Sequence, residues 1–478
     1  MKIYSHVKKI LSDTHTPVSV YLSLRDQYEK PLLLESADYS SRQGHYSYIC
    51  LNPFAEIEVQ QGIISKVIGK KSETISMNEK QTCLKEISAF SRLFHFDDLP
   101  FDFCYAGLFG YTGYSAIPYF EDIEFHARPE FDLPEIYYGF YSLMLVFDHC
   151  HDTLYLISHS LKDNDQLRQS DELEKNLQTT KLANFTFTPV GNLQVNCTDE
   201  EFCASIEKAK QHCKAGDVFQ LVLSKRYAQK FSGDEFNVYR ALRNVNPSPY
   251  MFYFDLGNYK LFGSSPEAQL KVGSSTAEIH PIAGTYKRTG SDSEDAVQAN
   301  KLFHDPKEKS EHMMLVDLAR NDLSKYCREV RVKNLAEIQF YSHVIHLVSM
   351  VQGQLKNDAE TFEILTGTFP AGTLSGAPKY RAMQLIDNIE KSSRQFYGGC
   401  IGFITHHGNI NHAILIRSFL SKDYTLTFQA GAGVVIHSVA ETENAEAENK
   451  CGALKAAIQH AATFNKPQKI KEYEIVGA

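Results

Sequence analysis

The chain has 478 residues, of which 43% are hydrophobic and 22% charged, a balance typical of ordinary soluble proteins with room for two to three domains or one unusually large one. The formal charge of −9 at pH 7 argues against the basic surface that a nucleic-acid partner requires. A small anionic substrate stays possible, because an acidic protein can still contain a local cationic pocket.

The N-terminus shows no sign of export, since MKIYSHVKKILSD lacks the apolar stretch and the small-residue cleavage site of a signal peptide. The longest apolar run, Tyr137 to Phe147, is shorter than the roughly 20 residues of a membrane helix, so it predicts a buried strand and no membrane partner. The ten cysteines form no CxxC pair, which argues against a disulfide framework and a zinc site. We therefore expect reduced thiols and a cytoplasmic location.

The first part of the chain, residues 1–160, predicts short strands, turns and some helices, because segments such as AEIEVQQGIISKVIG alternate apolar and polar residues. Residues 161–199 are rich in Asn, Gln, Lys and Glu, which predicts a surface helix followed by a linker. Residues 200–465 hold the remaining predicted elements, and residues 466–478 form a C-terminal tail.

The region 200–465 begins with a helix in DEEFCASIEKAKQHCKA, which should stop at Gly216 before a strand. Successive strands joined by tight turns are predicted in MFYFDL, KLFGSSPEAQLKV and AEIHPIAG. Three further helices are predicted from Pro306 to Tyr326, in APKYRAMQLIDNIEK and in AETENAEAENKCGALKAAIQHA. Antiparallel sheets covered by separate helices define an α+β architecture.

The predicted helix from Pro306 carries Glu308, Glu311 and His312 on one side, and Leu315 and Leu318 continue the stripe of Glu311. We therefore expect Glu311 to point toward the buried face. A buried carboxylate needs a cationic partner or a metal ion.

The last predicted helix carries Glu446 and Lys450 four residues apart, and Ala453 and Ala457 extend their stripe. An exposed Glu–Lys pair is the ordinary interpretation and would contribute roughly a few tenths of a kcal/mol. Because the pair stands at the head of an apolar stripe, a metal-binding role for Glu446 becomes more plausible than it would be on an exposed helix. Ligands that are oxygen only favour Mg²⁺ over zinc.

Several loops and strands suggest a site for a polycarboxylate. The glycines of QAGAGVVIHS allow close approach of the backbone and could form an anion nest, although such a turn alone is more typical of a hairpin. Arg417 is an isolated cation in the apolar strand HAILIRSFL, where a structural acid could equally pair with it. GTLSGAPK lacks the spacing of a phosphate loop, which argues against a nucleotide hydrolase. His346 alone is more often a core histidine than a catalyst.

A set of segments in a fixed order resembles the chorismate-utilising enzymes, and within that family anthranilate synthase component I, the aminase subunits. The segments are LLLESADYS, NPSPYMFYF, GSSPEAQL, PIAGT, SEHMMLVDLARNDL, YSHVIHLVS, GTLSGAPK, YGGCIGF, IRSF, AGAGVV and a Glu-rich helix containing NK. The resemblance spans nearly the whole chain. It implies a four-layer α/β/β/α sandwich of two large, mainly antiparallel sheets covered by helices, with the N-terminal region intertwined with the catalytic body.

The resemblance also implies roles for individual residues. Glu267 would be the general acid that helps the ring hydroxyl of chorismate to leave, His346 would assist the later loss of a proton and pyruvate, and Thr373 would orient the substrate. Glu311 and Glu446 would hold Mg²⁺. The groups expected to bind the substrate are Gly284, Thr285, Tyr397, Arg417, Gly431, Ala432, Gly433 and Lys450.

Two positions separate the branches of the resembled family. Branches that add water carry a lysine base where this chain has Gln220, and an amide is not a base. The aminodeoxychorismate branch carries a nucleophilic lysine where this chain has Ala283. With neither lysine present, ammonia is expected to be the nucleophile, and anthranilate and pyruvate the products. The family often has Arg-Pro-Arg after its Gly-Thr pair, whereas Tyr286, Lys287 and Arg288 follow here.

The resemblance also implies how the protein is regulated and with which subunit it assembles. Ser36 and the run Pro249, Tyr250 and Met251 resemble a site for L-tryptophan as feedback inhibitor, although LLLES also predicts a core strand. The chain lacks the nucleophilic-cysteine elbow of a glutaminase, so ammonia would come from a separate glutamine amidotransferase subunit, in a hetero-oligomer with two copies of each chain. The alternatives are an aminodeoxychorismate synthase aminase and a non-catalytic tryptophan-binding regulator.

Overall fold

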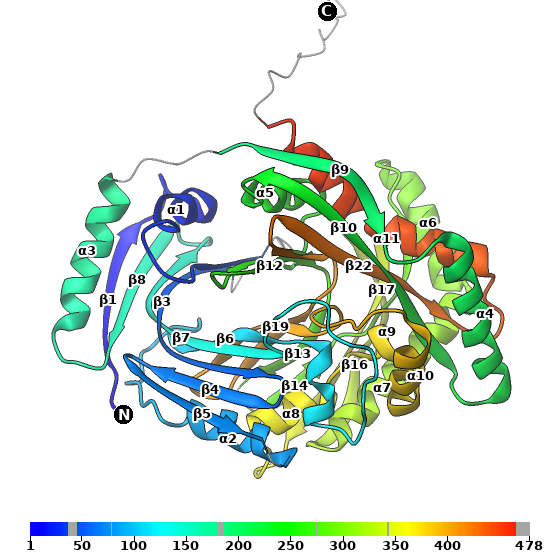
Figure 1. The fold of residues 1–478 in the computed structure, drawn as a ribbon, viewed down its shortest axis with the longest axis horizontal. Coiled ribbons are helices and arrows are strands. Elements are labelled where there is room, and N and C mark those ends of the chain that lie inside the picture. Colours follow the sequence, from blue (N-terminus) through cyan, green and yellow to red (C-terminus); the bar gives the residue numbers. More distant parts are fainter. Residues whose placement is uncertain (37–44, 78, 180–184, 274, 342–343, 465–478) are drawn as a thin grey trace, which may run out of the picture.

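The computed structural model describes residues 1–36, 45–77, 79–179, 185–273, 275–341 and 344–464. Within these residues the strands form one 22-stranded sheet that curves round on itself, and the helices lie mainly on its outside (Figure 1). Neighbouring strands pair antiparallel, so the α+β class is confirmed. The two sheets of the predicted sandwich are parts of this one hydrogen-bonded sheet.

The strands of the described residues differ greatly in length, from two residues to fifteen. In chain order they are β1 (Tyr4–Leu11), β2 (Leu32–Glu35), β3 (Tyr46–Gln60), β4 (Ile63–Ile68), β5 (Lys71–Ser76), β6 (Gly107–Thr112), β7 (Ile136–Asp148), β8 (Thr153–Ser160), β9 (Phe187–Val195), β10 (Gln220–Gly233), β11 (Tyr250–Asp255), β12 (Lys260–Ser265), β13 (Ala268–Gly273), β14 (Thr276–Ile279), β15 (Ile282–Lys287), β16 (Cys327–Phe340), β17 (Val344–Leu355), β18 (Gly376–Ala377), β19 (Cys400–Thr405), β20 (Ile410–Ile414), β21 (Ser418–Lys422) and β22 (Thr425–Val434).

The helices include the four that the sequence predicts in the second part of the chain. In chain order they are α1 (Pro17–Leu24), α2 (Gln81–Ser91), a 3-10 helix (Tyr114–Tyr119), α3 (Asp165–Thr179), α4 (Asp199–Ala215), α5 (Phe236–Val245), α6 (Asp292–His304), α7 (Pro306–Ser324), α8 (Thr361–Thr368), α9 (Gly372–Ser375), α10 (Lys379–Ile389) and α11 (Ala440–Ala461). Among the described helices, none combines the length and the apolar character needed to cross a membrane.

Strands from distant parts of the chain alternate in the sheet. β2 lies between β3 and β11, and β6 lies between β7 and β19. The N-terminal strands therefore share a continuous backbone hydrogen-bond network with the later ones. The boundaries predicted at residues 160, 199 and 465 stay predictions, and the predicted tail at 466–478 lies outside the described residues.

The polar segment 161–199 holds the expected helix α3, but strand β9 forms where a linker was expected. β9 pairs with the outer part of β10 and leaves most of its side chains exposed. Because backbone hydrogen bonds rather than burial hold this edge strand, its polar side chains give no strand signal, and Pro189 and Gly191 disfavour one. By contrast, the apolar run predicted as a strand is β7, which is buried along its whole length.

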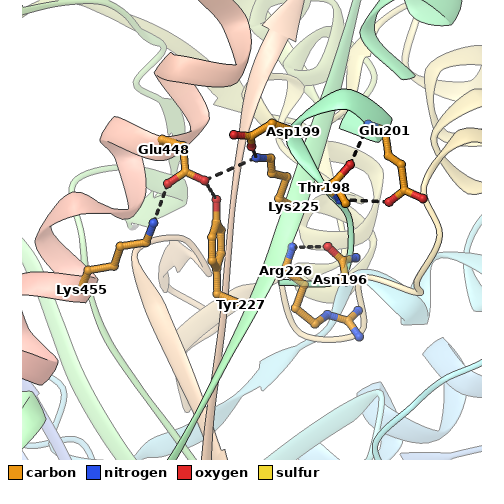
Figure 2. A network of polar contacts seen from close by, with 9 residues as sticks. All are labelled: Asn196, Thr198, Asp199, Glu201, Lys225, Arg226, Tyr227, Glu448 and Lys455. Atoms are coloured by element: carbon orange, nitrogen blue, oxygen red, sulfur yellow. Dashed lines mark hydrogen bonds and ion pairs between the residues drawn. The ribbon is translucent and has the colours of Figure 1, made fainter. Parts of the chain in front are cut away.

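A polar network attaches α4 and α11 to β10 (Figure 2). Glu448 of α11 accepts hydrogen bonds from Tyr227 of β10 and from Lys455 about two turns further along the same helix. The buried ammonium of Lys225 lies 2.5 Å from Asp199 at the start of α4 and 3.4 Å from Glu448. The orientation of α11 on the sheet is therefore fixed by charged hydrogen bonds as well as by packing.

Candidate active site

Glu267 lies in the short turn between β12 and β13 and is buried. The hydroxyl of Thr373, at the start of α9, donates to its carboxylate oxygens at 3.2 and 3.3 Å. Burial raises the pKa of Glu267 to about 8, although Thr373, Lys450 and Arg417 oppose the shift. At neutral pH the group is therefore mostly protonated, the state that a general acid requires.

Four carboxylates on two helices lie close enough to act on one another. Glu308 and Glu311 project from α7, and Glu443 and Glu446 from α11. Burial raises the pKa of Glu308 to about 7 with a contribution from Glu311, and it raises the pKa of Glu311 and Glu443 with a contribution from Glu446. The arrangement concentrates negative charge that a cation would stabilise.

Two of these glutamates were not predicted as part of a metal site. Glu308 was placed on the same side of its helix as Glu311 but received no role, and Glu443 was missed. Each stands three residues before a predicted ligand, Glu311 or Glu446, and so on the same helical face, which is the sequence signal that could have identified both.

Gln220, at the start of β10, donates from Nε2 to Oε1 of Glu311 at 2.8 Å. The side chain is almost completely enclosed. Gly433 of the neighbouring strand β22 packs against it, since a Cβ atom added there would lie 2.6 Å from Nε2. The predicted branch-determining residue and a predicted metal ligand are thus in direct contact.

Gly284 occupies the left-handed region with φ 67° in β15, and an added Cβ would meet Leu302 at 2.7 Å and Glu308 at 3.1 Å. Its carbonyl oxygen lies 2.9 Å from Nδ1 of His346 on β17, which identifies Nδ1–H as the donor. Burial lowers the pKa of His346 to about 4, so the ring is neutral. Ala283 is buried on β15 opposite Leu347, and the side chain of Thr285 lies outside the described residues.

The two cations expected to bind substrate face the same site, since both act on the pKa of Glu267 and of His346. Arg417 donates from Nη1 to Oδ1 of Asn246 at 3.3 Å, an amide and not the acid that an ion pair would need. Lys450 forms an ion pair with Glu446 at 2.7 Å and donates to the carbonyl of Gly431 at 3.1 Å.

The remaining predicted residues lie around this core. Ala432 is buried in β22 between Gly431 and Gly433, and Tyr397 is buried with its ring 5.7 Å from the guanidinium carbon of Arg394. Sequence reasoning missed Asn246, the partner of Arg417, because the two residues are far apart in the chain.

The four predicted inhibitor residues line a cavity of about 220 Å³ that contains none of the candidate active-site residues. We call it the second cavity, to distinguish it from the candidate active site. Ser36 follows β2, Pro249 precedes β11, and Tyr250 and Met251 begin β11. Phe403 of β19 and Asn411 of β20 also line the cavity. At its edge the buried carboxylate of Glu35 accepts hydrogen bonds from Tyr239 at 2.6 Å and Arg243 at 3.2 Å, both on α5. The sequence therefore located one real cavity from two segments more than 200 residues apart.

Known proteins resemble this one along nearly the whole chain. The family described as chorismate binding enzyme matches residues 32–456. The chain is 36% identical over 467 residues to the anthranilate synthase component 1 of Aquifex aeolicus and 37% identical over 473 residues to that of Acetivibrio thermocellus, and both alignments cover 95% of this chain and 94% of the relative.

Solved structures of related proteins have the same fold. The anthranilate synthase component I of Streptococcus pneumoniae is 30% identical, with a TM-score of 0.77 over 94% of this chain and 99% of that one. The menaquinone-specific isochorismate synthase of Escherichia coli, at 17% identity and a TM-score of 0.72 over 96% of this chain and 95% of that one, shares the fold. Since the family match and the relatives span nearly its full length, the chain belongs to the chorismate binding enzymes.

Proposed function

We propose that the chain is the aminase component of an anthranilate synthase, which converts chorismate and ammonia into anthranilate and pyruvate at the start of tryptophan synthesis. One observation carries the proposal: a buried glutamic acid with a pKa of about 8, Glu267, faces two cations, Arg417 and Lys450. Such a site can hold a dicarboxylate and protonate a leaving hydroxyl at neutral pH. The relatives named anthranilate synthase component 1 support the same reaction.

In the first step, Glu267 donates its proton to the ring hydroxyl of chorismate, and Thr373 holds the carboxyl group in position for the transfer. Arg417, Lys450 and the backbone of β22 at Gly431 to Gly433 bind the carboxylates of the substrate. The leaving hydroxyl departs as water, and the nucleophile forms the new bond at the ring carbon beside the carboxylated carbon.

Ammonia is the proposed nucleophile because neither family lysine is present. The amide of Gln220 donates to Glu311 and cannot remove a proton from water. Ammonia carries its own lone pair and needs no base for the attack. Ala283 leaves no amine to attack the ring covalently.

The neutral imidazole of His346 supports the second step, in which the ring loses a proton and pyruvate. Its Nδ1–H is held by the carbonyl of Gly284, so the ring orientation and the tautomer are fixed. A histidine whose pKa is about 4 stays uncharged at neutral pH and is available to receive a proton. Aromatisation of the ring provides the driving force, so the protein mainly has to orient the enolpyruvyl ether.

The acidic cluster suits Mg²⁺, because its donors are carboxylate oxygens and the pKa of three of them is raised by burial and by mutual repulsion. Glu311 and Glu446 would hold the ion, with Glu308 and Glu443 behind them. When bound, Mg²⁺ would supply a positive charge against the ring carboxylate of chorismate.

Feedback inhibition and assembly complete the proposal. The cavity lined by Ser36 and Pro249 to Met251 has the volume for an amino acid of the size of L-tryptophan. The label component 1 of the relatives implies a second subunit, proposed here as a glutaminase that supplies ammonia, in an assembly with two copies of each chain. The ten free cysteines support a reducing, cytoplasmic setting.

The test is to incubate the purified chain with chorismate, Mg²⁺ and an ammonium salt at mildly alkaline pH, with and without L-tryptophan, and to separate the products chromatographically. Anthranilate and pyruvate in equal amounts, suppressed by tryptophan, would support the reaction, the nitrogen source and the regulation. A para-aminated ring that keeps its side chain would identify the aminodeoxychorismate reaction instead. Tryptophan binding without turnover would identify a regulator.

A matched variant addresses the branch assignment directly. Ala283→Lys places an amine where the aminodeoxychorismate branch has its nucleophile, so anthranilate formation should fall. An unchanged rate of anthranilate formation would remove Ala283 from the determinants of the reaction.

A further inference from the structure

Asp98, His406 and His407 form a cluster outside the candidate active site. Within the described part of the chain, they are the one group of three or more His, Cys, Asp or Glu residues whose potential ligand atoms all lie within 4.8 Å of one another. The two histidines occupy the turn between β19 and β20, and Asp98 lies in the segment between α2 and β6. The cluster therefore joins two segments that are about 300 residues apart in the chain and lie side by side in the fold.

The distances suit a small transition-metal ion. Oδ1 of Asp98 lies 3.3 Å from Nε2 of His407 and 4.0 Å from Nε2 of His406. Ligands about 2.0–2.1 Å from a tetrahedral Zn²⁺ are separated from one another by roughly 3.3–3.5 Å. The first distance already has this value, and the second requires a shift of about half an ångström, which the exposed side chain of Asp98 can make.

His406 is prepared as a ligand by its surroundings. Its backbone N–H donates to the carbonyl of Ala106 at 3.0 Å, and Nδ1 lies 3.2 Å from the same oxygen. Because a carbonyl oxygen only accepts, the proton of the neutral ring must lie on Nδ1. The lone pair on Nε2 then has two neighbours, the hydroxyl of Tyr105 at 3.0 Å and Oδ1 of Asp98 at 4.0 Å. A backbone carbonyl behind a histidine is the usual partner that fixes the tautomer and orientation of a metal ligand.

The position of Asp98 is also held by a neighbour. The hydroxyl of Tyr105 accepts from the backbone N–H of Leu99 at 3.0 Å and lies 3.2 Å from the carbonyl of Asp97. The same hydroxyl lies 3.0 Å from Nε2 of His406. Tyr105 thus connects the residues on both sides of Asp98 to His406, so the two segments of the cluster are held together without any ion.

We propose that Asp98, His406 and His407 bind a divalent transition-metal ion, with Zn²⁺ as the representative. Two imidazoles and one carboxylate are the donor set that zinc prefers, whereas Mg²⁺ favours sites built from oxygen alone. The exposure of Asp98 and His407 leaves the fourth position open to water. Since β19 and β20 also line the second cavity at Phe403 and Asn411, the ion fastens the turn of a cavity-lining hairpin to the segment before β6.

The experiment is an isothermal titration of the full-length, untagged chain with ZnCl₂, in the presence of excess Mg²⁺ to occupy sites built from oxygen. Three variants accompany it: His407→Ala, Asp98→Asn and the control His151→Ala. His151 is an exposed histidine 2.8 Å from a carboxylate oxygen of Asp148, but among the described residues this pair has no third potential ligand that completes a cluster. All three changes are at exposed histidines or at an exposed carboxylate, so a melting curve should show folded protein in each case.

We expect one Zn²⁺ per chain, with an affinity at least ~100-fold lower in His407→Ala and Asp98→Asn and unchanged in His151→Ala. Co²⁺ in place of Zn²⁺ should give the strong visible absorption of tetrahedral coordination, and His407→Ala should abolish it. The proposal is overturned if no stoichiometric Zn²⁺ binding occurs beside Mg²⁺. It is equally overturned if all four proteins bind Zn²⁺ with the same affinity, because the ion would then lie elsewhere.

Discussion

At the scale of single residues, the protonation state of Glu267 governs the proposed reaction. Glu267→Gln keeps the shape of the side chain but cannot transfer a proton, so kcat should fall by about 10²–10⁴-fold. In the parent enzyme the acid loses its proton as the pH rises through about 8, so kcat/KM should decline there. Steady-state rates across this range should show the decline in the parent and none in the residual activity of the variant.

The pH dependence of the free energy of unfolding provides a second test of Glu267. The pKa of Glu267 is raised in the folded protein, so the folded state binds the proton more tightly than the unfolded state, and stability falls as the pH rises between the unfolded and the folded pKa. Glu267→Gln should remove this loss. Denaturant unfolding at acidic and alkaline pH measures it, and a parallel loss in both proteins would contradict the burial argument.

The proposed Mg²⁺ site can also be tested at a single residue. Glu446→Gln should raise the Mg²⁺ concentration needed for half-maximal activity by at least about tenfold, because a charged oxygen ligand is lost. The matched control is Glu441→Gln, which changes an exposed carboxylate in the first turn of the same helix. If both variants have the parent's Mg²⁺ requirement, Glu446 is not a ligand.

At the scale of elements, replacing glycine by alanine should have opposite effects at two positions, Gly452 in helix α11 and Gly433 in strand β22. An added Cβ at Gly452 of α11 meets nothing within 4 Å, so Gly452→Ala should stabilise the protein by about 0.5–1 kcal/mol through better helix propensity, with activity unchanged. Gly433→Ala places its Cβ 2.6 Å from Gln220 Nε2 and should lower activity by displacing that amide from Glu311.

Thermal unfolding and steady-state rates of the two variants check this contrast. A Gly433→Ala enzyme with full activity would show that the Gln220 amide moves without consequence. A Gly452→Ala protein that melts earlier than the parent would mean that α11 is not a regular, solvent-exposed helix at that position.

Elements also show what the sequence could and could not provide. The segment predicted as the last helix coincides with α11, because a long run of helix-forming residues needs no distant partner to be recognised. The strand β9 could not be predicted, because it is held by backbone pairing with β10 and its own side chains stay polar. In the candidate site, helical spacing singled out Glu311 and Glu446, and the resemblance supplied Glu267. Glu308 and Glu443 received no role, although helical spacing links each to a predicted ligand.

At the scale of the whole molecule, the second cavity draws its lining from segments that no local pattern connects. Ser36, Tyr250 and Phe403 meet there because β2 pairs with β11 and because β19 lines the same cavity. The resemblance of two motifs identified four residues of this lining, and the others depended on the path of the chain in three dimensions. Asn246 beside Arg417 was missed for the same reason.

Binding in this cavity should be visible as stability of the entire chain. L-tryptophan at about one hundred times its Kd should stabilise the folded protein by about 2.7 kcal/mol and raise its melting temperature. Ser36→Phe fills part of the cavity and should remove the shift, whereas Met313→Ala, at an exposed methionine of α7, should keep it. Thermal melts with and without tryptophan measure both, and an equal shift in all three proteins would place the inhibitor elsewhere.

The alternation of early and late strands has a consequence for biosynthesis. β6 pairs with β19, so Thr112 cannot pair with Cys400 until that residue has been synthesised. At the usual rates of translation, the intervening stretch of about 290 residues takes roughly 15–60 seconds to make. During that interval the ribosome-bound chain presents one edge of β6 without its partner strand, and unpaired edges promote association between chains. Completion of the sheet is therefore one of the last events in the synthesis of this protein, and nascent chains that stop before residue 400 lack the strand that covers this edge.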